Sequence, residues 1–107
     1  MKNKNIIQNK NKGIYSETLK FDDNDSLSLL CGEFDKNLKL LENEANVKIL
    51  PRGNLIAVNG EFSDVKKVLV VLEKLYKSAK KKTIIDYGEL RGTLNMVENY
   101  KNSNNKI

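Results

Sequence analysis

The sequence of 107 residues contains no histidine and no tryptophan, and it has a single cysteine, Cys31, and a single proline, Pro51. Without histidine the chain cannot hold a Ser-His-Asp or Cys-His nucleophile, or a zinc site that needs imidazole. One cysteine excludes an intramolecular disulfide and a four-cysteine metal cluster. These absences exclude the commonest forms of nucleophilic and metal-assisted catalysis.

Glycine is also sparse, and the six glycines do not form a phosphate-binding loop. Neither G-x-x-x-x-G-K-[ST] nor G-x-G-x-x-G can be written from their positions, so the loops that hold nucleotide phosphates are absent from this sequence. The carboxylates do not form a convincing acid–base pair. We therefore expect no catalytic residue, no cofactor and no enzymatic activity in this chain.

Long apolar runs are missing as well. No stretch approaches the roughly 18–20 apolar residues of a membrane span, and the basic N-terminus lacks the apolar core of a signal peptide. A lone cysteine without an export signal is typical of a reducing compartment. The sequence predicts a cytoplasmic protein that does not contact a membrane.

One acidic segment has a spacing similar to that of a calcium-binding EF-hand loop. Asp22, Asn24, Ser26 and Glu33 stand where such a loop has ligands. The sixth position of the loop needs glycine for its sharp turn, and here it is Leu27. The apolar run that follows is typical of a buried helix, so we expect no metal site.

Lysine is what the sequence has in excess, and it is unevenly distributed along a chain of net charge +5. Residues 1–13 carry four lysines and no acid, and residues 63–82 carry seven lysines and two acids. Residues 14–62 between them carry five basic and nine acidic side chains. Such asymmetry is typical of proteins with an anionic partner such as nucleic acid, although lysines that only solvate the surface give the same pattern.

Hydrophobic periodicity predicts the order strand, helix, helix, strand, strand, helix, followed by an appended helix. The predicted strands are Tyr15 to Phe21, Val47 to Leu50 and Leu55 to Val58, with residues 51–54 as a hairpin turn. The first helix is expected from Ser26, with Asp25 or Asn24 as its N-cap, and Gly32 ends it. The second runs from Lys36 to about Ala45, with Asp35 as its N-cap.

The clearest predicted helix follows Gly60, after Glu61 or Ser63. Its apolar side chains recur with helical spacing and form one stripe: Val65, Val68, Leu69, Leu72, Leu75 and Tyr76. A last helix is expected to begin at Asp86. Residues 14–82 are therefore predicted to form one domain with an appended helix over 83–100, and the polar segments 1–13 and 101–107 are predicted to be disordered tails.

Three strands with helices on one face make a two-layer α+β domain. This β-α-α-β-β-α order, with a tight link between the first two helices, resembles a KH domain. In KH domains that link is a G-x-x-G loop, whose glycines let the protein backbone approach a nucleic-acid backbone. Here Gly32 keeps the first glycine, Asp35 replaces the second, and Glu33 occupies a middle position.

The resemblance to KH domains implies a binding surface for single-stranded RNA made of Gly32, Glu33, Phe34, Asp35, Lys36, Asn37, Lys39 and Arg52. The two carboxylates stand where a phosphate would dock, and Asp35 as N-cap would occupy the helix N–H groups that a phosphate uses. Lys36 and Lys39 partly offset this charge. We therefore expect RNA to bind weakly.

A longer stretch, Leu19 to Tyr76, resembles the N-terminal domain of PhoH-like proteins. The matching residues are Leu30-Cys31-Gly32, Asp35-x-Asn37-Leu38-x-x-Leu41-Glu42, Val47-x-Ile49, Arg52-Gly53-Asn54, Gly60 and Val71-Leu72-x-x-Leu75-Tyr76. Members resemble RNA-associated cytoplasmic ATPases in which this small domain precedes a P-loop ATPase domain. Some are linked to an endoribonuclease of ribosomal RNA maturation. The acidic replacement of the second loop glycine is similar to that family.

Two functions follow from this resemblance. The first is a non-catalytic KH-like module that contacts or positions RNA for a PhoH-like ATPase; ATP and Mg²⁺ would then belong to the ATPase domain, which this sequence does not contain. The second is a protein-interaction domain whose acidic loop docks on the ATPase domain or on an RNA-processing nuclease.

The missing phosphate-binding loop leads to the first prediction. Calorimetric titration of the chain with Mg-ATP should give no binding heat, because the glycines and the lysine of a nucleotide loop are absent from the sequence. A stoichiometric isotherm in the micromolar range would contradict this expectation.

Overall fold

The computed structural model of the chain describes residues 14–106, with side chains described from residue 14 to residue 99. Its elements are β1 (Tyr15–Lys20), α2 (Asn24–Cys31), the short 3₁₀ helix η1 (Glu33–Asp35), α3 (Lys36–Ala45), β2 (Lys48–Arg52), β3 (Leu55–Gly60), α4 (Phe62–Lys80) and α5 (Tyr87–Lys106). This is the predicted order of strands and helices, with η1 added in the link between the first two helices. The predicted tail 1–13 lies outside the described residues.

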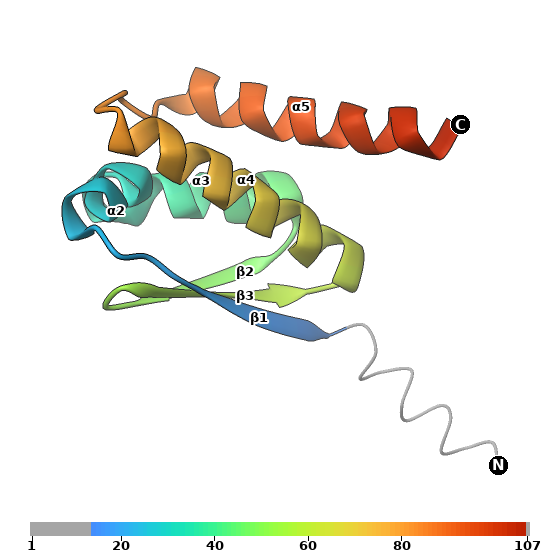
Figure 1. Cartoon of the computed structure of the whole chain (residues 1–107). Coiled ribbons are helices and arrows are strands. Elements are labelled where there is room, and N and C mark those ends of the chain that lie inside the picture. Colours follow the sequence, from blue (N-terminus) through green and yellow to red (C-terminus); the bar gives the residue numbers. More distant parts are fainter. Residues whose placement is uncertain (1–13, 107) are drawn as a thin grey trace, which may run out of the picture.

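The three strands form one antiparallel sheet in the order β1-β3-β2. Glu17 of β1 lies opposite Val58 of β3, and Val58 lies opposite Ile49 of β2. Val58 and Ile49 are buried beneath the helices, and the side chains before and after them point to the other face because a strand alternates. Figure 1 shows α2, α3 and α4 on one face of the sheet, with α5 beyond them and no labelled element on the opposite face.

Helix α4 covers the sheet and carries the stripe of apolar side chains that its sequence predicts. Five of the six predicted positions are buried: Val65, Val68, Leu69, Leu72 and Leu75. The sixth, Tyr76, lies at the margin of the core, where its ring meets the ring of Phe21 edge-on at 4.7 Å between centroids. The Tyr76 hydroxyl accepts a hydrogen bond from the N–H of Asp23 at 2.8 Å. Through Tyr76, helix α4 therefore contacts both the end of β1 and the start of α2.

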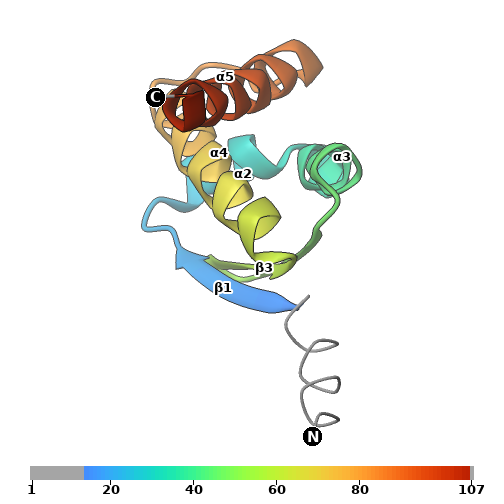
Figure 2. The same ribbon diagram turned by 90° about the vertical axis from the view of Figure 1, so that its right-hand side faces the viewer.

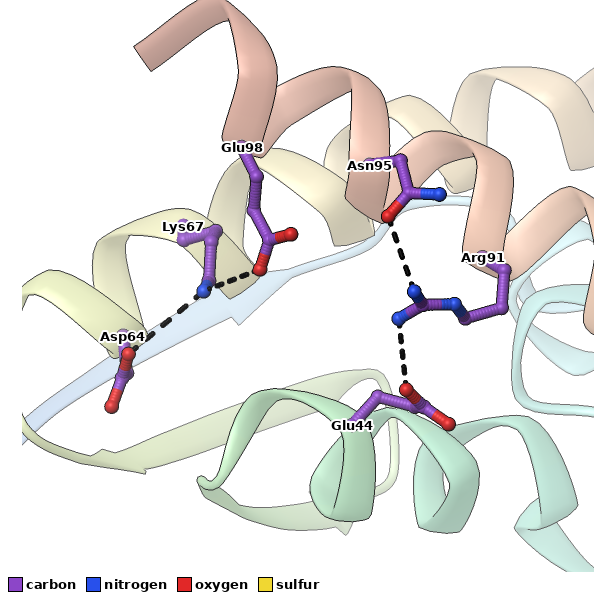
Figure 3. Close-up of polar contacts among 6 residues, drawn as sticks. All are labelled: Glu44, Asp64, Lys67, Arg91, Asn95 and Glu98. Carbon is purple, nitrogen blue, oxygen red and sulfur yellow. Dashed lines mark hydrogen bonds and ion pairs between the residues drawn. The ribbon is translucent and has the colours of Figure 1, made fainter. Parts of the chain in front are cut away.

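Helix α5 lies on the helices on the side away from the sheet, and two basic side chains tie it there (Figure 3). Nζ of Lys67 on α4 lies 2.9 Å from a carboxylate oxygen of Glu98 on α5. Arg91 on α5 lies 2.8 Å from the carboxylate of Glu44 on α3. These pairs are partly exposed, so the buried apolar side of α5 contributes more to its attachment than they do. None of the helices in the described part of the chain is long and apolar enough to cross a membrane.

The outer edge of β2 has no free N–H donor from Val47 to Pro51. The N–H of Val47 donates to the backbone oxygen of Glu42 at 3.3 Å, and the N–H of Ile49 donates to the Glu42 carboxylate at 2.6 Å. The next outward position along this edge is Pro51, which has no N–H. One glutamate of α3 and one proline thus protect β2, whereas β1 is the open edge of the described sheet.

The structure corrects the start of the first helix. Helix α2 begins at Asn24 with Asp23 as its N-cap, whereas the sequence predicted Asp25 or Asn24 before Ser26. The backbone oxygen of Asp23 accepts from the N–H of Leu27 at 2.9 Å, which forms the first helical hydrogen bond. The Asp23 carboxylate accepts from the Ser26 hydroxyl. With four candidate acceptors in a row, composition alone does not select the cap.

Two further boundaries also move. Strand β2 continues through Arg52, so the turn contains only Gly53 and Asn54 instead of residues 51–54. The appended helix was expected over 83–100, with a disordered tail at 101–107, and α5 instead runs to Lys106. Its start is capped, because Oδ1 of Asp86 accepts from the N–H of Glu89 at 2.8 Å. Beyond residue 100 the sequence has no proline or glycine to stop the helix.

The buried stripe of α4 leads to a stability prediction. The side chain of Leu72 is fully buried, so Leu72→Ala leaves a cavity and should lower the free energy of unfolding by roughly 2–5 kcal/mol. Lys74 is exposed on the same helix, and Lys74→Ala should change it little. Urea melts of both variants measure this difference, and equal midpoints would show that the stripe does not form the core.

Candidate nucleic-acid interface

A groove of about 630 Å³ opens between α2, the link at residues 32–35 and the β2–β3 turn. Its lining consists of Asp22, Asn24, Leu27, Ser28, Cys31, Gly32, Asp35, Pro51, Gly53 and Asn54. The charged side chains in this lining are the carboxylates of Asp22 and Asp35, and no lysine or arginine is among them. The groove therefore presents neutral hydrogen-bonding groups and negative charge to a ligand.

The link that borders the groove has an unusual backbone. Gly32 has φ of 80°, and the following Phe34 and Asp35 have φ of 54° and 58°. Two consecutive residues other than glycine in the left-handed region are uncommon, and an aromatic side chain there is a marked exception. Such conformations persist when the surrounding structure holds them, and they are concentrated at functional sites.

The side chain of Asn37 holds this link in place. Its Nδ2 donates to the backbone oxygen of Leu30 at 3.0 Å and to that of Ile85 at 3.1 Å. It therefore caps the end of α2 and connects α3 to the segment that leads into α5. A β-carbon at Gly32 would lie 2.8 Å from this Nδ2, so the close approach requires glycine at position 32.

The burial of Asn37 corrects its predicted role in binding RNA. The residue is 2% exposed, so it cannot contact a ligand at the surface. Its Oδ1 has no hydrogen-bond partner in the described part of the chain. The sequence could not show this, because the partners of Nδ2 lie 7 and 48 residues away.

The predicted capping of α3 by Asp35 is only partly confirmed. Asp35 occupies the N-cap position, but it is left-handed and its side chain accepts no hydrogen bond from the helix. A capping side chain needs an extended backbone to turn back toward the first N–H groups, and φ of 58° does not provide it. The carboxylate instead lines the groove, so its effect on an anionic ligand is repulsion and not occupation of the helix N–H groups.

The other predicted residues lie around the groove and not in it. Glu33 and Phe34 are exposed at the rim, and Lys36 and Lys39 are exposed on α3 outside the lining. Arg52 is placed differently, because strand alternation puts Pro51 in the groove and Arg52 on the opposite face of the sheet. Arg52 therefore does not share a surface with Gly32 and Asp35, and its contact with RNA stays a prediction.

Only Gly32 and Asp35 of the predicted site residues line the groove. The other eight lining residues were not predicted as site residues: Asp22, Asn24, Leu27, Ser28, Cys31, Pro51, Gly53 and Asn54. Asn54 is fixed by Phe21, since its backbone oxygen accepts from the Phe21 N–H at 2.9 Å and its Nδ2 donates to the Phe21 oxygen at 3.3 Å. The signal for Asn54 was its place in the turn between two predicted strands. Ser28 had a signal as the polar position on α2 one turn before Gly32.

Cys31 lines the same groove but does not supply a nucleophile. Burial raises the pKa of its thiol to about 11, and the negative charge of Asp35 acts in the same direction. The thiol is therefore protonated at neutral pH, and a protonated thiol is a poor nucleophile. The expected role of Cys31 as a small core residue agrees with its burial.

Comparisons with known proteins bear on the fold of the chain. No protein-family model matches the sequence, and none of the curated proteins is similar to it in sequence. Among solved structures, Dim2p from Pyrococcus horikoshii OT3 matches 79% of this chain with a TM-score of 0.62 and 15% identity. A protein of unknown function from Aeropyrum pernix matches 86% with a TM-score of 0.57 and 11% identity. The chain covers 50% and 52% of these two structures.

The predicted fold class is confirmed: the chain has a KH-like β-α-α-β-β-α fold with a three-stranded antiparallel sheet and an added C-terminal helix. At these identities the likeness concerns the fold alone. The chain spans about half the length of the solved structures it matches.

The close approach between Gly32 and the Asn37 side chain leads to a stability prediction. Its control variant is expected to change the free energy of unfolding in the opposite direction. Gly32→Ala places a β-carbon at φ of 80° against Asn37 and should lower the free energy of unfolding by at least about 1–2 kcal/mol. Gly92→Ala introduces the same methyl group into α5, where no atom lies within 4 Å, and should raise it by up to about 1 kcal/mol. Thermal melts of both variants test the pair, and a stabilised Gly32→Ala would show that the link does not have this geometry.

Proposed function

We propose that the chain is a non-catalytic RNA-contacting module that positions single-stranded RNA for a partner ATPase. The observation that carries this proposal is the groove between the α2–α3 link and the β2–β3 turn in a KH-like fold. In KH domains the corresponding link clamps the nucleic-acid backbone, and bases lie beside it. The uneven lysine content of the sequence supports an anionic partner.

The chemistry of the groove supports a weak contact. Asn24, Ser28 and Asn54 offer hydrogen-bonding groups to a base, whereas Asp22 and Asp35 repel a phosphate. Two unit charges 4 Å apart interact by about 1 kcal/mol in water, and by more in a partly dry groove. RNA bound there is therefore expected to be held by its bases more than by its backbone.

The PhoH-like resemblance supplies the proposed context. In this proposed context the module precedes a P-loop ATPase domain, and that domain holds ATP and Mg²⁺. The module works in the cytoplasm with an endoribonuclease of ribosomal RNA maturation. Of the residues that carry this resemblance, Gly32 and Asp35 lie in the link, Asn37 lies in the first turn of α3, and Arg52, Gly53 and Asn54 lie at the β2–β3 turn. The matching sequence motifs are the support for this ATPase and nuclease context. The context says which partners the chain has and says nothing of the chemistry of the chain itself.

A second function is favoured by one observation, the exposure of Phe34. This side chain is 86% exposed at the tip of the link, in a left-handed conformation between Glu33 and Asp35. Large aromatic side chains are frequent anchors of protein interfaces. The alternative is therefore a protein-interaction domain whose acidic loop docks on a basic surface of the ATPase domain or the nuclease.

A charge change in the link separates the two functions. Glu33→Lys with Asp35→Gly restores the second glycine and removes two carboxylates next to the groove. Affinity for a single-stranded RNA 12-mer should rise, and the slope of log Kd against log salt should steepen by about 0.7, as expected for one added phosphate contact on a single strand. Gly tolerates the left-handed backbone at position 35, so the fold should be kept.

A matched control carries the same change of charge away from the groove. Glu61→Gln with Glu73→Lys alters two exposed glutamates outside the groove lining, and it should change RNA affinity less than the link variant. If the link variant and the parent bind RNA with equal affinity, the groove is not an RNA-binding site. In that case titration with the ATPase domain of a PhoH-like protein, with Phe34→Ser as the comparison, would test the docking function.

A further inference from the structure

The second face of the sheet is a flat surface that no described element covers. Figures 1 and 2 show the labelled helices gathered on one side of the strands, and neither view shows a labelled helix or strand on the opposite side. The register and the alternation of side chains assign nine residues to this face in three cross-strand rows. The rows are Ser16–Asn59–Lys48, Thr18–Ala57–Leu50 and Lys20–Leu55–Arg52.

The charge on this sheet face has one sign. Lys20, Lys48 and Arg52 are exposed, and each makes no ion pair with a described residue. The nine residues of the face include no aspartate or glutamate. The acid of β1, Glu17, belongs to the helical face, where it pairs with Lys66 at 2.9 Å. The sheet face is thus cationic without internal neutralisation.

The groove and the sheet face therefore differ in charge. The groove lining has two carboxylates and no basic side chain, whereas the sheet face has three basic side chains and no carboxylate. A polyphosphate approaching the described surface is repelled by the first and attracted by the second. Lys20 and Arg52 stand at the two ends of one row, two strand spacings or about 10 Å apart, and Lys48 lies four residues from Arg52 along β2, about 13 Å. Separate phosphates of one strand can reach cations with this spacing.

We propose that the open sheet face binds the phosphate backbone of single-stranded RNA, through Lys20, Lys48 and Arg52. This inference rests on the proposed function, and it assigns the electrostatic part of RNA binding to the face opposite the groove. The backbone contact there complements a groove that offers hydrogen bonds to bases.

The composition of the sheet face also indicates how RNA is bound. It has no aromatic side chain on which a base could stack. Leu50 and Leu55, which are 45% and 39% exposed, provide flat apolar contact between the cations. Binding through phosphates without stacking or base-edge contacts is independent of sequence. The sheet face should therefore bind oligouridine and oligoadenosine of equal length with equal salt dependence.

The experiment neutralises the three cations of the sheet face in the full chain. Lys20→Gln, Lys48→Gln and Arg52→Gln are combined, and Kd for a fluorescent oligouridine 12-mer is measured by anisotropy between 0.05 and 1 M salt. Each phosphate contact on a single strand contributes about 0.7 to the slope of log affinity against log salt. The triple variant should therefore lose about 2 from this slope and bind about 100-fold more weakly at 0.1 M salt, with curves that converge near 1 M.

Two matched variants carry the same loss of three charges. One changes Lys74, Lys77 and Lys81 to Gln, which are exposed on and after α4. The other changes three of the four lysines in residues 1–13, Lys2, Lys4 and Lys10, to Gln. Both should keep the slope within about 0.7 of the parent. Single Arg52→Gln and Lys48→Gln variants, each expected to lower the slope by about 0.7, give the same test if the triple variant does not fold by circular dichroism.

The outcomes separate the inference from the proposed function. If the parent binds the 12-mer and the sheet-face variants keep its slope, while the α4 or N-terminal variant loses it, the sheet face is not the phosphate site and the inference is overturned. If the parent does not bind RNA at all, both the proposed function and this inference fail. A slope lost only in the sheet-face variants supports the inference.

Discussion

Burial of α4 is the constraint on which the rest of the structure depends. This helix packs against β1, β3, α2, α3 and α5, so all but one of the major elements are placed by contact with it. Its side chains at Val65, Val68, Val71 and Leu72 are fully buried, which requires apolar neighbours both below it in the sheet and above it in α5. The outer helix α5 therefore covers α4 on the side away from the sheet, and no described helix covers the second face of the sheet.

The elements of the fold were predictable because their signals are local. The stripe of α4, the apolar run from Leu55 to Val58 and the turn residues between the two strands each lie within a short stretch of sequence. The exact caps were not predictable in the same way. Four consecutive polar residues from Asp22 to Asp25 can each begin a helix, and Asp23 is selected by the Tyr76 hydroxyl, 53 residues away. Tertiary contact therefore decides what local propensity leaves open.

The candidate site was predictable in position but not in detail. The tight link between two helices predicted a site beside Gly32, and in the structure a groove with two carboxylates in its lining borders this link. The left-handed backbone of Asp35 and the burial of Asn37 depend on hydrogen bonds to Leu30 and Ile85, which the sequence order does not bring together. Arg52 was predicted in a turn, which assigns it to neither face of the sheet; because β2 continues through Arg52, strand alternation determines the face on which it lies.

The unequal edges of the sheet limit how copies of this protein can assemble. Glu42 and Pro51 leave no free outward N–H along β2 between Val47 and Pro51, so a strand added to the described sheet pairs more readily with β1. Two chains that joined through their β1 edges would form a six-stranded sheet bounded by two protected β2 edges. Such an assembly closes at two copies, and it does not continue into a fibre.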